Sequence, residues 1–156
     1  MISATHIHAM VIHFPVALIL AGFLSELISF FSKKEFFSKA AFYLLILGAL
    51  GAVVAYISGN AAGSGIEEGP LKKPLELHEQ AATITLWLAI ITAFFRAGML
   101  YFKESRKWAR ITGLVLFLAL SGAVARTGYL GGQLVYSHGA GVLLALPDFG
   151  ETAGEE

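Results

Sequence analysis

The sequence predicts an all-α integral membrane protein, a four-helix bundle, from its composition and from the spacing of its charges. Of 156 residues, 56% are hydrophobic and 14% are charged. This balance is too apolar for a small soluble domain, which has a large surface to cover with polar groups. No Asp, Glu, Lys or Arg occurs in residues 40–66, 80–95 or 111–125. Uncharged apolar stretches of this length are typical of membrane-spanning helices.

The four spans are predicted in chain order, each separated from the next by a polar or glycine-rich connection. The first is expected over residues 7–31 and the second over 37–58, joined by the polar turn in FFSKKEFFSK. The third is expected over 75–102, after the Gly- and Pro-rich loop GNAAGSGIEEGPLKKP. The fourth is expected over 108–127, after KESRKWAR. Pro15 lies early in the first span, where the missing N–H costs least.

The C-terminal part of the chain departs from this pattern. Residues 127–147 are also uncharged, but five glycines crowd the segment and weaken a continuous helix. We therefore expect a half-helix or a lid folded over the bundle rather than a fifth span. Residues 1–147 are predicted to form one transmembrane domain, and the acidic tail 148–156 is predicted to be disordered.

Basic residues predict the orientation. They concentrate around the first and third connections, which the positive-inside rule places in the cytoplasm. Both termini and the 59–74 loop then face outward, to the periplasm of a bacterial inner membrane. The N-terminus has no basic region typical of a cleaved signal peptide, so we expect the first helix to insert uncleaved. Glu26 is expected at the cytoplasmic interface.

Composition also excludes several classes of function. The chain has no cysteine, which removes disulfides, thiolate metal sites, Cys-ligated iron–sulfur clusters and covalent c-type haem. The formal net charge is zero and there is no basic stripe, so nothing indicates a nucleic-acid partner.

Histidines are the most informative residues. All five fall on the predicted outer side: His6, His8, His13, His78 and His138. Ionisable residues in membrane helices are costly and tend to mark function. His6 and His13 share a helix face but lie about 10.5 Å apart along the axis, too far to bind one metal ion. Ligands must therefore pair between helices, as in bundles that hold a cofactor between facing helices.

Haem b is the favoured cofactor. One or two haems would be bound by pairs drawn from His8, His13, His78 and His138. If one haem binds, we expect the pair His13 and His78, because both sit on firm helices. Small residues on the second and fourth spans suit a flat ring, although they equally suit ordinary helix packing. Arg126 and Tyr136 are candidates to hold the propionates. Copper, iron or zinc bound by the same histidines is the alternative.

Three segments resemble a bacterial membrane family, domain-of-unknown-function family 2231. They are HAMVIHFPVAL, LHEQAATITLWL and GGQLVYSHGAGV, and the resemblance covers nearly the whole chain. It implies that His8, His13, His78 and His138 are the recurring histidines, although the chain reads His8-Ala9 where the family typically reads His-Pro. It also implies association with cytochrome c or Rieske-type domains, and hence redox chemistry at the outer face.

We therefore predict a membrane-embedded b-type cytochrome module, an electron-transfer subunit of an oxidoreductase complex. It would pass electrons between quinol or a partner subunit and a periplasmic redox carrier. We expect contact with membrane lipid and assembly as a homo-oligomer or a complex subunit. The alternatives are a histidine-based transition-metal transporter and a structural subunit of a membrane complex.

Overall fold

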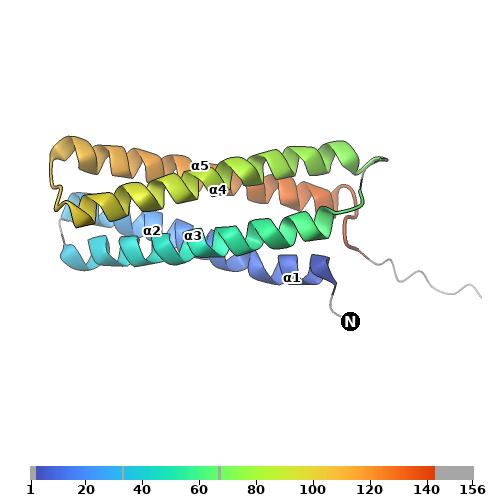
Figure 1. Cartoon of the computed structure of the whole chain (residues 1–156), viewed down its shortest axis with the longest axis horizontal. Helices are drawn as coiled ribbons and strands as arrows, with labels where there is room; N and C mark the ends of the chain where they lie inside the picture. Colours follow the sequence, from blue (N-terminus) through green and yellow to red (C-terminus); the bar gives the residue numbers. More distant parts are fainter. Residues whose placement is uncertain (1–2, 33, 67, 143–156) are drawn as a thin grey trace, which may run out of the picture.

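The computed structural model describes residues 3–32, 34–66 and 68–142, and these residues are helical apart from short connections (Figure 1). The helices are α1 (Ala4–Val11), α2 (His13–Ser32), α3 (Glu35–Gly63), α4 (Lys72–Tyr101) and α5 (Lys107–Tyr136). Taken together, α1 and α2 form one long apolar segment, Ala4–Ser32. The described chain thus has four segments long and apolar enough to cross a membrane, as the hydropathy pattern predicted.

The first span is not one continuous helix, as we had expected over 7–31. It is interrupted at Ile12, between α1 and α2. Pro15 supplies the physical reason, because it has no N–H to donate to the carbonyl of Val11 and its ring crowds that carbonyl. Pro15 is buried against α3, where a Cβ added to Gly51 would lie 3.3 Å from the proline Cδ.

The helices pack in a closed ring in which α2, α3, α4 and α5 each contact the next and α2 contacts α5. The centre of the ring is filled by large apolar side chains, among them Ile19, Leu45, Phe117 and Leu120, all fully buried. Close approach needs small residues, as is usual between membrane helices. A Cβ added to Gly48 would lie only 2.7 Å from Ile19 Cγ1, so α2 and α3 require glycine there.

The outer surface of the bundle is apolar, which fits a lipid environment. Large hydrophobic side chains along every long helix are exposed, including Leu24, Leu50, Ile91 and Leu118. Several hydroxyl side chains are instead buried and bond to their own helices. Thr85, Thr92 and Ser121 each donate to the carbonyl four residues earlier.

The connections separate into two ends (Figure 1). The end of α2, the start of α3 and the α4–α5 connection lie at one end, and the start of α1, residues 64–66 and 68–71 and residues 137–142 lie at the other. We call the end that holds the start of α1 and residues 137–142 the histidine end. At the opposite end, Arg106 donates to Glu104 through Nε and Nη2 and lowers the pKa of Glu104 to about 2.

The glycine-rich segment is built differently from our expectation of a half-helix or lid over 128–147. Helix α5 does not end at Thr127 but continues to Tyr136, so residues 128–136 extend the fourth span. Gly139 then adopts a φ of 65°, and the N–H of Ala140 donates back to the carbonyl of Leu134. The turn reaches α1, since a Cβ on Gly141 would lie 2.8 Å from Thr5 Cγ2. Residues 143–147 and the predicted tail lie outside the described residues.

Candidate functional site

His8 projects from α1 toward α3, where its ring rests on a glycine. The imidazole is half-buried, and its Nδ1 lies 3.0 Å from the hydroxyl of Ser58. A Cβ on Gly59 would lie 3.0 Å from the ring Cε1, so the ring occupies space that any larger residue would fill. The Ser58 hydroxyl donates to the carbonyl of Ala55, 3.0 Å away. With the serine hydrogen placed on this carbonyl, the serine oxygen is the acceptor for His8 in the tautomer that carries its hydrogen on Nδ1.

His78 repeats this arrangement on the other helix pair. It lies in the second turn of α4, half-buried, with Nδ1 3.2 Å from the backbone carbonyl of Thr127 on α5. A carbonyl only accepts, so Nδ1 carries the hydrogen. The ring lies over Gly131, where an added Cβ would be 3.1 Å from Cε1. Thr127 is itself held by a hydrogen bond of its hydroxyl to that of Thr85, at 2.9 Å.

Both histidines therefore leave the same ring nitrogen, Nε2, free to act as a ligand. With Nδ1 protonated and occupied, the lone pair of the neutral ring lies on Nε2. This is the arrangement found in metal-ligating histidines, whose other ring nitrogen donates to a carbonyl, carboxylate or water that fixes the ring orientation. Each ring is thus oriented by a neighbouring helix, His8 by α3 and His78 by α5.

The two rings lie close enough for a charge on one to act on the other. They come from helices that do not pack directly, because α1 contacts α2 and α3 but has no Cα within 8 Å of α4 or α5. The structure brings together one histidine from each half of the chain.

The remaining predicted site residues are placed elsewhere. His13 is exposed at the start of α2, and its pairing with His78 stays a prediction. His138 is exposed after the end of α5. Arg126 and Tyr136 are both exposed on α5, the tyrosine by 91%. His6, which we had not assigned as a ligand, lies 2.7 Å from Ser3 through Nδ1.

Sequence reasoning missed the groups that orient the rings. Ser58 closes an otherwise apolar span one residue before Gly59, and this polar residue on a small-residue face was an available signal. The acceptor on α5 is a backbone carbonyl, which every residue carries, so no residue type marks it. Gly131 was interpreted as a helix breaker, whereas it provides room for the His78 ring.

A buried ion pair in the opposite half of the bundle was also missed. Arg96 Nη2 of α4 lies 2.8 Å from Glu26 Oε2 of α2, and their side chains are 10% and 7% exposed. The carboxylate of Glu26, which we expected at the cytoplasmic interface, is buried inside the bundle. The arginine stem packs on α5 at Gly113, where an added Cβ would lie in ordinary van der Waals contact with Arg96 Cδ, at 3.4 Å. The pair joins α2 to α4 across the ring.

Comparison with known proteins agrees with the resemblance noted in the sequence. Residues 4–143 match the model of a family described as "Predicted membrane protein (DUF2231)". No curated protein and no solved structure matches the chain. The family match spans all four membrane-length helices and the turn that follows them. The chain therefore belongs to the DUF2231 family of predicted membrane proteins.

Proposed function

We propose that this chain is a membrane electron-transfer module that binds one b-type haem between His8 and His78. The observation that carries the proposal is the state of the two rings. Each uses its Nδ1 hydrogen on a neighbouring helix and leaves Nε2 as a ligand. Two such nitrogens from two different helices are the ligands that haem iron takes in a bis-histidine cytochrome.

The number of donors favours haem over a metal ion. Among the described residues, no group of three or more His, Cys, Asp or Glu side chains could hold a metal ion. A protein-bound zinc ion ordinarily takes three or four protein ligands. In haem the porphyrin supplies four nitrogens, so two histidines are enough. The copper, iron or zinc alternative would need further ligands beyond His8 and His78.

The protein would orient the two ligating rings and hold them against the helix backbones. When bound, haem iron supplies reversible one-electron transfer. Ser58 and the Thr127 carbonyl hold the ring planes, and these hydrogen bonds raise the basicity of the ligating nitrogens. Gly59 and Gly131 let both rings lie against the helix backbones. Electrons would pass between quinol or a partner subunit and a periplasmic carrier, with the histidine end facing outward.

One haem, rather than two, fits the placement of the histidines. His13 and His138 are exposed, and no hydrogen bond from another described side chain orients either ring. The expected stoichiometry is therefore one haem per chain. Arg126 and Tyr136 do not enter the proposal as propionate partners, because both side chains are directed outward.

A visible spectrum of the full-length protein, purified in mild detergent from haem-replete cells, tests the proposal. We expect b-type bands that sharpen on reduction with dithionite, and one haem per chain by pyridine haemochrome. His8→Ala and His78→Ala should each abolish the spectrum. His6→Ala is the matched control, two residues from His8 on the same helix, and should retain it. A colourless protein, or bands that survive loss of both His8 and His78, would overturn the assignment.

A further inference from the structure

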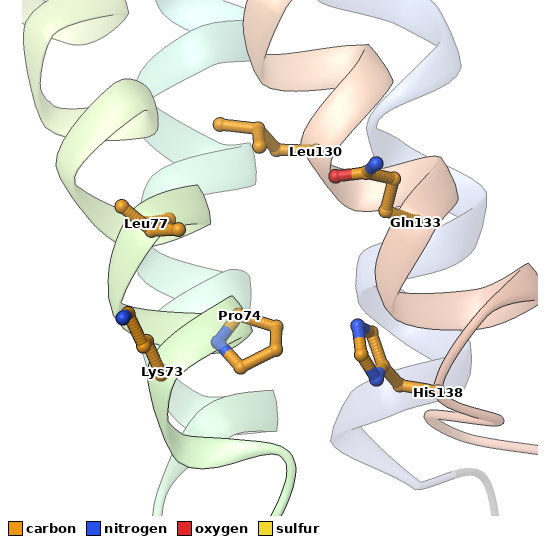
Figure 2. A pocket seen from close by; sticks show the side chains of 6 residues that line it. All are labelled: Lys73, Pro74, Leu77, Leu130, Gln133 and His138. Atoms are coloured by element: carbon orange, nitrogen blue, oxygen red, sulfur yellow. The ribbon is translucent and has the colours of Figure 1, made fainter.

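A cavity of about 190 Å³ opens between α4 and α5 at the histidine end (Figure 2). Its lining residues are Lys73, Pro74, Leu77, Leu130, Gln133 and His138. That volume suits a single small ring and is too small for a porphyrin or a folded peptide.

The two walls differ chemically. Pro74 and Leu77 form an apolar wall on α4, whereas Gln133 and His138 bring hydrogen-bonding groups from α5 and the turn after it. Figure 2 shows the rings of Pro74 and His138 on opposite sides of the opening, with the Gln133 amide above them. One Gln133 N–H donates to the Tyr129 hydroxyl at 3.0 Å, which leaves the amide oxygen and the second N–H for another partner.

The cavity is not built for an anion. Lys73 is the cationic residue in its lining, and Figure 2 shows that side chain extending away from the space between Pro74 and His138. The interior is mainly apolar with neutral hydrogen-bonding groups along one side. This pattern recognises a flat, uncharged ring that carries oxygen atoms at its edge.

The cavity lies next to His78, the proposed haem ligand. Leu77 directly precedes His78, and Leu130 directly precedes Gly131, on which the His78 ring rests. The cavity and the His78 ring therefore share the same turns of α4 and α5. A molecule bound there would lie beside the side chain proposed to ligate the iron.

We propose that this cavity binds the ring of a quinone or quinol, with His138 and Gln133 as hydrogen-bond partners of the ring oxygens and Pro74 and Leu77 against its face. The inference deepens the proposed function, on which it rests, by naming the electron donor or acceptor class and its binding place. The isoprenoid tail would leave along the apolar helix surface. His138 is then a ligand-binding residue for the quinone rather than a haem ligand.

Direct binding of a short-chain quinone, decylubiquinone, to the full-length protein in detergent tests the inference, with the haem spectrum recorded on each sample. We expect saturable binding of one molecule per chain. His138→Leu and Gln133→Leu should each weaken it about 3- to 10-fold, the range for loss of one net hydrogen bond. Leu130→Trp, which fills the cavity, should abolish binding. Gln80→Leu, the same change at an exposed position on α4, should have no effect.

The spectrum separates this inference from the proposed function. Absence of saturable binding by a protein with an intact b-type spectrum overturns the quinone site and leaves the haem assignment standing. Binding that survives both Leu130→Trp and His138→Leu also overturns it. A colourless protein that binds decylubiquinone with the expected variant pattern supports the cavity assignment while overturning the haem proposal.

Discussion

Removal of the Arg96 charge is expected to destabilise the bundle strongly, because Glu26 would remain buried without its partner. The charged atoms lie 2.8 Å apart, which corresponds to about 6 kcal/mol of Coulomb attraction at an effective dielectric constant of roughly 20. Most of this offsets the cost of desolvating both ions, so the net value of the pair is smaller. Loss of one partner leaves the desolvation of the other uncompensated, which lowers the free energy of unfolding by about 3–5 kcal/mol for Arg96→Gln.

A double-mutant cycle measures this effect as free energies of unfolding in mixed detergent micelles. Arg96→Gln and Glu26→Gln should each be strongly destabilising, whereas the double variant should lose much less than their sum, because two amides can bond to each other. Lys39→Gln is the control, since Lys39 and Glu35 also lie 2.8 Å apart but are exposed, and it should match wild type. Equal effects of Arg96→Gln and Lys39→Gln would refute the reasoning.

Two further predictions concern the rings themselves. Gly131→Leu should displace the His78 ring and abolish the b-type spectrum. Gly132→Leu should keep it, because an added Cβ there would meet no side chain or other helix within 4 Å beyond its chain neighbours. Equal spectra in the two variants would contradict the packing of His78 on Gly131. Ser58→Ala removes the acceptor of His8 Nδ1 and should increase haem loss to a competing haem-binding protein about 10- to 100-fold, the range for loss of such supporting hydrogen bonds. An unchanged rate of haem loss would show that Ser58 does not orient the ligand.

The spans were predictable from the sequence because they depend on local properties. Hydropathy and the distribution of charges are read along the chain, and membrane insertion depends on the same quantities. The four predicted spans correspond to the four membrane-length segments of the structure. The boundaries were less predictable. Helix α5 continues past Thr127 despite its glycines, because helix propensity is a weak preference that tertiary packing, here of Gly131 against the His78 ring, can override.

Pairing of side chains depends on how the helices rotate and tilt against one another. Hydropathy leaves these angles open, because several helix faces are apolar enough to turn inward. Glu26 and Arg96 are 70 residues apart, and each has a reasonable interfacial interpretation by itself. They become an ion pair only because α2 and α4 direct these two positions toward each other.

The sequence by itself determined the class of protein and the concentration of histidines in one half of the bundle, because both follow from the order of apolar and polar residues along the chain. The tertiary structure decided which histidine of the first span packs against α3. The interruption before Pro15 separates α1 from α2, and α1 packs on α3 with the His8 ring on Gly59, while His13 is left exposed. The selection of His8 is thus a consequence of backbone geometry and close packing, which residue order alone does not specify.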